Sequence, residues 1–253
     1  MRSLSDKILH DHVDKSTITF VGQAGFVFKS QTGHLLGLDL YLSDCGERKY
    51  GFKRLMPKLI TPEDIVFDAI LCSHEHYDHF DVDAVPLLLA NSKTTLIAAN
   101  DCRKLVERLE LTNKKIRYMA VGDSIIISDF TIHSVWCDHG VDTPDAVGFI
   151  IEYDGIRVYY AGDTCLRKDK AEDITRVGPI DVMIAPINGA FGNMNEIEMA
   201  EYAGLIKPRL TIPCHYWNWA EHGGNPGVFA EEMNRNYPGQ KYLIMAQGEI
   251  FEI

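Results

Sequence analysis

The sequence has no long uninterrupted run of apolar residues. No stretch of the 253 residues approaches the roughly 18 apolar residues of a membrane-spanning helix, and the N-terminal segment MRSLSDKILHDHVDKS lacks the apolar core of a signal peptide. Basic residues are also few, because 25 Lys and Arg stand against 36 Asp and Glu and leave a net charge of −11. These absences predict a cytoplasmic protein that neither enters a membrane nor offers a basic face to nucleic acid.

The six cysteines never fall in a CxxC pair, and their spacing does not predict a disulfide framework. With 46% hydrophobic residues, a chain of this length can build a core without covalent cross-links. We therefore expect reduced and mostly buried cysteines.

Apolar segments typical of strands alternate with segments typical of helices, and no Pro/Gly-rich linker divides the chain. We expect one domain over residues 1–253. The predicted strands lie in 17–28, 34–42, 68–73, 94–99, 123–128, 130–137, 146–153, 156–163, 181–187, 209–214 and 241–246. The predicted helices lie in 4–15, 81–92, 100–111, 168–177, 195–206 and 227–236, and TPEDI at 61–65 resembles a helix start. Each half runs from several antiparallel strands into alternating strand and helix, which predicts an α/β (α+β) fold of four layers, an αββα sandwich.

One segment concentrates metal-ligating side chains. SHEHYDHF, at 73–80, follows a short apolar strand and contains His74, His76, Asp78 and His79. In an extended segment His74 and His76 point to the same side, so both can reach one ion, while Asp78 and His79 can turn toward a neighbouring one. Imidazole and carboxylate ligands suit zinc, manganese or iron as divalent ions.

Three other polar residues follow apolar strands in the same way. His139 comes after FTIHSVWC, Asp163 closes IRVYYAGD, and His215 follows RLTIPC. Because ligands gather where strands end at one edge of a sheet, we expect these three beside the cluster.

These motifs together resemble the metallo-β-lactamase superfamily of binuclear hydrolases. The resemblance covers residues 39–216 and is carried by HEHYDH, His139, AGDT and IPCHY. Within the superfamily, LDLYLSD, DAILCSHEHYDHFDVDAV and IPCHYWNWAEHGGNP are similar to the L-ascorbate-6-phosphate lactonase-like group. The resemblance implies the αββα fold, two divalent ions and a metal-bridging hydroxide as nucleophile.

The resemblance also implies a role for each matching residue. His74, His76 and His139 would bind one ion; Asp78, His79 and His215 would bind the other; Asp163 would bridge both. Asp39 resembles the family's aspartate that supports a ligand without binding an ion.

The expected reaction is hydrolysis of a lactone of a small, anionic sugar acid such as L-ascorbate 6-phosphate. Asp78 or His222 would relay a proton to the leaving oxygen. Five cations in RKYGFKRLMPK, at 48–58, would draw in a phosphate, and the candidates for its binding are Arg48, Lys49, Lys53 and Arg54. The alternatives are a phosphodiesterase of the same fold and a non-catalytic metal-binding protein. Whether copies of the chain form a homo-oligomer stays open.

A second histidine pair, His10 and His12, resembles the metal-ligating cluster in sequence only. HDHVDK, at 10–15, nearly repeats the cluster but precedes the first strand on a predicted helix. Lys15 stands where the cluster has a histidine and would repel a cation. We therefore expect His10 and His12 to bind no ion.

Overall fold

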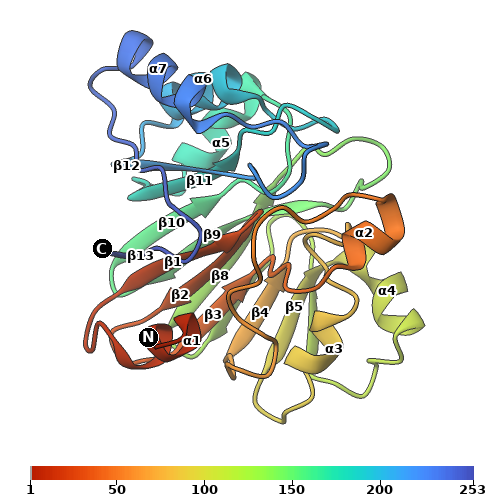
Figure 1. The fold of residues 1–253 in the computed structure, drawn as a ribbon. Helices are drawn as coiled ribbons and strands as arrows, with labels where there is room; N and C mark the ends of the chain where they lie inside the picture. Colours follow the sequence, from red (N-terminus) through yellow and green to blue (C-terminus); the bar gives the residue numbers. More distant parts are fainter. Residues whose placement is uncertain (1) are drawn as a thin grey trace.

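Two β-sheets form the centre of the molecule, as the computed structural model of residues 2–253 shows (Figure 1). The first sheet has the strand order β13-β1-β2-β3-β4-β5-β6 and the second β12-β11-β10-β9-β8-β7. The first contains β1 (Thr17–Gly22), β2 (Gly25–Lys29), β3 (Leu35–Leu38), β4 (Ala69–Cys72), β5 (Thr95–Ala99), β6 (Ile116–Met119) and β13 (Ile250–Glu252). The second contains β7 (Ser124–Ile127), β8 (Phe130–Trp136), β9 (Val147–Tyr153), β10 (Ile156–Tyr160), β11 (Val182–Pro186) and β12 (Leu210–Cys214).

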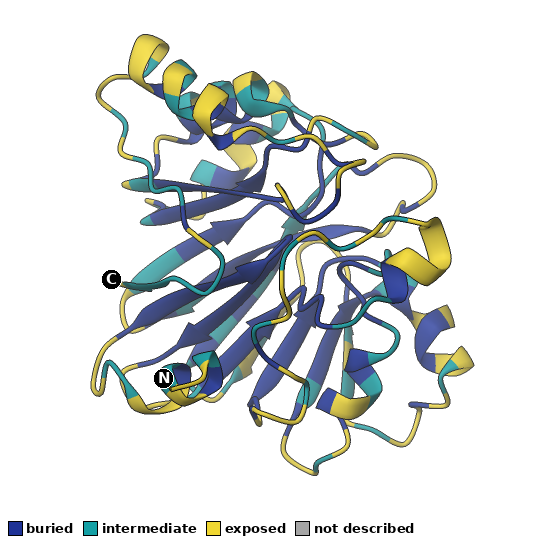
Figure 2. Ribbon diagram, in the orientation of Figure 1, coloured by how far each residue is buried: buried dark blue, intermediate teal, exposed yellow. Residues whose placement is uncertain are grey.

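The burial of the strands follows from their place in the sheets. Every residue of β1, β2, β3, β4 and β11 is buried, because these strands are covered on both faces. The edge strand β7 instead alternates exposed and half-buried residues. Figure 2 shows buried strands in the centre and exposed surface mainly on helices and loops.

Helices lie outside both sheets (Figure 1). The helices α5 (Ala171–Thr175), α6 (Glu196–Ile206) and α7 (Pro226–Asn236) gather beyond β11 and β12. The others, α1 (Leu4–His10), α2 (Cys45–Tyr50), α3 (Ala84–Leu88) and α4 (Arg103–Arg108), accompany the first sheet, and two 3-10 turns span Asn100–Cys102 and Lys168–Lys170. None of the helices in residues 2–253 is long and apolar enough to cross a membrane. The predicted layered α/β sandwich is confirmed, with one hydrophobic core drawing on both sheets.

The local predictions fail in a few places. The predicted strand at 241–246 forms only an isolated bridge between Tyr242 and Thr211, because the chain leaves β12 there and pairs with β1 only at β13. The predicted helix start at 61–65 is a turn, since Asp64 accepts a hydrogen bond from the Thr61 N–H and donates its own N–H to the Thr61 carbonyl. The N-terminal helix ends at His10, and β6 and β13 have no counterpart among the predicted strands.

Candidate metal centre

The ends of strands from both sheets supply the site. Asp39 follows β3, the histidine cluster follows β4, His139 follows β8, Asp163 follows β10 and His215 follows β12. Parallel pairing of β3 with β4 and of β10 with β11 and β12 brings the carboxyl ends of these strands to a common edge. The structure therefore brings together polar residues that are far apart in the chain, at the carboxyl ends of strands from both sheets.

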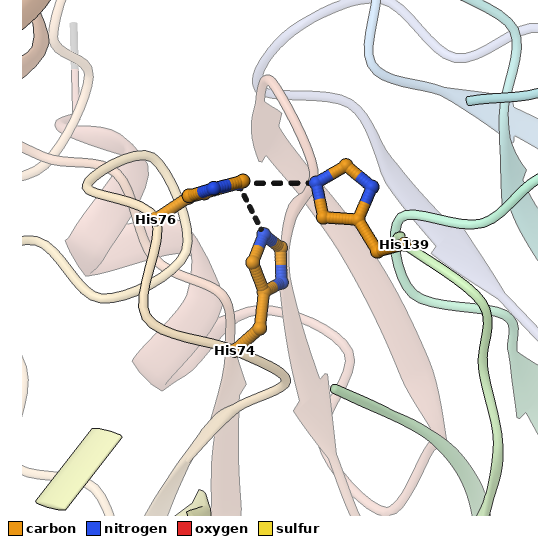
Figure 3. A group of neighbouring side chains, drawn as sticks. All are labelled: His74, His76 and His139. Atoms are coloured by element: carbon orange, nitrogen blue, oxygen red, sulfur yellow. Dashed lines mark hydrogen bonds between the residues drawn. The ribbon is translucent and has the colours of Figure 1, made fainter. Parts of the chain in front are cut away.

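His74, His76 and His139 form the first group (Figure 3). His76 Nδ1 lies 3.0 Å from His74 Nε2 and 3.0 Å from His139 Nε2. Nitrogen ligands about 2.0–2.1 Å from a tetrahedral ion stand about 3.3 Å apart. The three imidazoles are thus spaced as ligands of one ion are.

Asp163 lies between this group and a second one. Its Oδ2 is 3.8 Å from His139 Nε2 on one side, and on the other it is 3.3 Å from His79 Nε2 and 3.2 Å from His215 Nε2. Asp78 Oδ2 is 3.3 Å from the same His215 nitrogen and 3.5 Å from that of His79. One carboxylate oxygen therefore faces ligands of both groups, as a bridging ligand would.

The residues present fit metal ions. His79 Nε2 and Asp163 Oδ1 are buried without a hydrogen-bond partner, and a buried polar atom without a partner is costly. Burial lowers the pKa of His74, of His76 and of His139, which favours the neutral imidazole that a metal requires.

In the second group, which consists of Asp78, His79 and His215, the carboxylates attract positive charge to the imidazoles. Burial alone would lower the pKa of His215, but the neighbouring Asp163 and Asp78 carboxylates outweigh it and raise that pKa to about 9. The pKa of His79 is raised well above its usual value in the same way, burial being outweighed by Asp163 and Asp78. Two buried carboxylates thus attract protons onto neighbouring imidazoles, and a divalent cation would satisfy the same demand.

Asp39 supports the site from behind. Its Oδ2 lies 2.7 Å from His79 Nδ1 and accepts hydrogen bonds of 2.6 Å from the hydroxyls of Ser73 and Tyr160. Its Oδ1 accepts one from the Ser73 backbone N–H. A carboxylate on one ring nitrogen holds the tautomer in which the other nitrogen is free to bind a metal, so Asp39 aims His79 Nε2 into the site.

Replacing Asp39 with Asn should weaken metal binding. The amide keeps the size of the side chain but loses the charge that orients His79. Loss of such a supporting carboxylate costs about 10- to 100-fold in metal affinity, which titration of the metal-free protein with zinc or manganese would measure. An unchanged affinity would mean that the Asp39–His79 contact stabilises the fold only.

Two residues that the sequence did not single out join the site, Gln23 and Asn193, and His222, predicted as a proton relay, lies beside them. Gln23, in the β1–β2 turn, donates its Nε2–H to Asp78 Oδ2 at 2.9 Å. Asn193, after β11, donates its Nδ2–H to Asp163 Oδ2 at 2.8 Å. His222 Nδ1 is 3.1 Å from His215 Nδ1, and the two residues form a third candidate ligand group with Asp78.

Backbone strain gathers at the same place. Gln23, Asp39 and His215 adopt left-handed backbone conformations with φ of 56°, 44° and 65°. Residues other than glycine rarely adopt such angles, and they persist where the surrounding structure holds them for function.

The sequence carries only weak signals for the two residues that it did not assign to the site. Gln23 lies in the turn sequence GQAG, and Asn193 lies in the loop that follows a buried strand.

The predicted phosphate-binding residues lie outside the metal ligands. Arg48 pairs with Asp83 at 2.5 Å. The Arg54 side chain is 7% exposed and lies against the loop after β3, with its Nε 3.2 Å from Asp44 and Nη2 2.5 Å from the Ser43 carbonyl. Lys49 and Lys53 form no ion pair within the part of the chain that the structure describes. The cations of 48–58 are thus unequal: Arg48, Arg54 and Lys58 have acidic partners, and Lys49 and Lys53 have none in the described part of the chain.

The second histidine pair lies apart from the metal centre. His10 is exposed at the end of α1, and His12 contacts Glu252 at 3.0 Å. Lys15 pairs with the same glutamate. Replacing both histidines with alanine should leave the metal content, measured by elemental analysis, unchanged. Loss of a full equivalent of metal would show that His10 and His12 bind an ion, which contradicts the prediction.

A cavity of about 150 Å³ opens onto the metal centre. Its floor is formed by His76, Asp78, His139, Asp163, Asn193 and His222. Its walls are aromatic and consist of Tyr50, Phe52, Phe191 and Trp219. No lysine or arginine lines it among the residues that the structure describes. The segment 48–58 therefore reaches the cavity through its aromatic side chains.

Comparison with known proteins agrees with this geometry. The family model for the beta-lactamase superfamily domain matches residues 17–215. A UPF0173 metal-dependent hydrolase of Thermococcus onnurineus is 30% identical over 194 residues, which are 76% of this chain and 84% of that protein. Another, of Thermococcus kodakarensis, is 29% identical over 93% of this chain and 99% of its own length.

A solved structure shares the fold. A metallo hydrolase of Ignicoccus hospitalis superimposes with a TM-score of 0.74 and 19% identity, over 94% of this chain and 98% of the other. The family match and the relatives, together with the histidine and aspartate groups described above, identify the chain as a metal-dependent hydrolase that belongs to the beta-lactamase superfamily and, within it, to the UPF0173 family.

Proposed function

We propose that the protein is a binuclear metal-dependent hydrolase that opens a lactone or a similar small ester. The observation that carries the proposal is the position of Asp163 Oδ2 between two groups of imidazoles, 3.8 Å from His139 Nε2 and 3.2 Å from His215 Nε2. Two ions held there would activate water as a nucleophile and stabilise charge on the oxygen of the bond that is cleaved. Zinc and manganese suit the ligand set best, with iron as a third option.

The residues of the chain hold this machinery in place. Asn193 fixes the Asp163 carboxylate through its amide N–H, and Asp39 fixes the ring of His79. Both contacts are buried, so the ligands are oriented before a substrate enters. The aromatic walls of the cavity keep bulk water from the ester, which strengthens electrostatic interactions at the reacting atoms.

Asp78 and His222 are the candidates to relay to the leaving oxygen the proton that the attacking water gives up. Both line the cavity, and each contacts His215, at 3.3 Å for Asp78 Oδ2 and 3.1 Å for His222 Nδ1. Gln23 Nε2 lies 2.9 Å from Asp78 Oδ2 and 3.2 Å from His222 Nδ1. This amide therefore couples the positions of the two candidates.

A phosphate on the substrate would be bound by the cations that have no acidic partner. Arg48 and Arg54 are engaged with Asp83 and Asp44, so the candidates for binding the phosphate of an anionic lactone are Lys49 and Lys53, which do not line the aromatic cavity. Replacing both with alanine should raise KM for a phosphorylated lactone about ten- to a hundredfold, the loss of one charged hydrogen bond. It should change KM for an uncharged lactone little, and equal effects on both would exclude phosphate binding by this segment.

The bond type is tested by a screen of the protein loaded with zinc or manganese. Lactones, phosphodiesters and thioesters are offered in parallel, and an Asp163→Asn variant prepared in the same way serves as the control. We expect hydrolysis of lactones by the wild type and none by the variant. Hydrolysis of phosphodiesters alone would replace the proposed reaction with the phosphodiesterase alternative.

A further inference from the structure

We propose that the cavity above the metal centre binds a flat, apolar group of the substrate, the size of a single benzene-like ring, and that Phe52 and Phe191 select it. This inference rests on the proposed function for the bond that is cleaved. It adds the chemical class of the group that lies beside that bond.

The size and walls of the cavity carry the argument. A benzene-sized ring fits a cavity of about 150 Å³, and the cavity here has about this volume, with aromatic walls above a polar floor. The Phe52 ring lies 5.4 Å from Trp219 and 5.7 Å from Phe191, measured between ring centroids. Aromatic rings prefer offset or edge-to-face neighbours at 4.5–7 Å, so these rings pack against one another and present a continuous apolar surface to the cavity. A flat ring contacts such a surface better than a bulky or strongly hydrated group does.

Phe191 is the least expected of the wall residues. The residue is 59% exposed, and its backbone has a φ of 54°, which is unfavourable for phenylalanine. Its ring centroid nevertheless lies 5.1 Å from that of His222, at the floor of the cavity. An exposed aromatic residue held in a strained conformation beside the metal centre is more consistent with substrate contact than with core packing.

The opposite wall is held rigidly. Trp219 is 2% exposed and its ring packs edge-on against Tyr41 at 5.2 Å. Arg54 stacks over the same tyrosine at 4.0 Å and forms an isolated β-bridge with Trp219. Arg54 thus connects the segment that carries Phe52 to the loop that carries Trp219, and a preformed wall costs little free energy on binding.

Binding is tested without hydrolysis, by NMR titration of the metal-free and metal-loaded protein with benzyl alcohol and with cyclohexylmethanol. Each probe carries a six-membered carbon ring on the same CH2OH group, and only the ring of the first is flat. We expect wild type to bind benzyl alcohol more tightly, and Phe52→Ala and Phe191→Ala each to weaken its binding roughly tenfold. Leu55→Ala is the matched control, because Leu55 lies on the same segment as Phe52, is 53% exposed and does not line the cavity.

Hydrolysis is measured on two γ-butyrolactones, one carrying a phenyl group and the other a cyclohexyl group. We expect kcat/KM to favour the phenyl lactone in wild type and in Leu55→Ala, and the preference to disappear in Phe191→Ala. Equal binding of the two alcohols, or a preference that survives both phenylalanine variants, would overturn the inference. Selective binding of benzyl alcohol without hydrolysis of either lactone would contradict the proposed reaction and leave the inference about the cavity standing.

Discussion

Replacing Asp163 with Asn should abolish hydrolysis, with kcat/KM falling roughly a thousandfold or more. Asp163 Oδ2 lies 3.2–3.8 Å from ring nitrogens of both ligand groups, so in the proposed binuclear centre its charge would help to hold both ions. An amide of the same shape is a weaker ligand and carries no charge. The metal content of the purified variant should fall with its activity, and elemental analysis would measure it.

Asp169→Asn is the matched control for this variant. Asp169 is a surface residue that pairs with Arg167 at 2.7 Å, and it contacts no residue of the metal centre. Its replacement should leave activity and metal content unchanged. Retention of both ions and of activity in Asp163→Asn would contradict the bridging position that we assign to this carboxylate.

Removing the metal ions with a chelator should abolish hydrolysis and lower the melting temperature. The site is assembled from the ends of strands in both sheets, so an ion binds the folded chain and not the unfolded one. At a metal concentration of 100 times Kd, such binding stabilises the fold by about 2.7 kcal/mol. For a chain of this size this corresponds to a rise in Tm of roughly 5–10 °C.

The His10→Ala, His12→Ala double variant should show the same rise in Tm as wild type when zinc or manganese is added. A Tm that does not respond to either ion in wild type would show that the histidine groups are satisfied without a metal.

The architecture was accessible from the sequence because the interior strands are apolar on both faces. Segments such as AILC in β4 and VMIAP in β11 are buried throughout, and runs of this kind identify buried strands without further information. β13 could not be found in this way, since its three residues are only half-buried or exposed and owe their conformation to pairing with β1. The stretch 241–246 shows the converse, an apolar run that finds only one bridging partner.

The metal centre was accessible because one rule, a polar residue at the end of an apolar strand, applies to most of its members. His139, Asp163 and His215 all obey it. Gln23 and Asn193 belong to residue types that are common in turns, so only the tertiary structure distinguishes them by their contacts with Asp78 and Asp163. His222 was named from the sequence as a proton relay, but its contact with His215 comes from the path of a loop that no local pattern specifies.

The segment 48–58 shows where reasoning from local charge stops. Its cations stand out because no acidic residue lies among them. The fold brings acidic partners from elsewhere, Asp83 to Arg48 and Asp44 to Arg54 and Lys58. The aromatic residues of the same segment, Tyr50 and Phe52, line the cavity instead. Ion pairs formed in the tertiary structure therefore leave fewer cations of this segment free to bind a substrate, while its aromatic side chains line the cavity.

A crystal structure of the zinc- or manganese-loaded protein with anomalous scattering from the metal tests the central claim most directly. We predict two ions per chain, about 3.5–4 Å apart, with Asp163 between them. His74, His76 and His139 should bind one ion, and Asp78, His79 and His215 the other. A single ion, or two ions without Asp163 between them, would contradict the account.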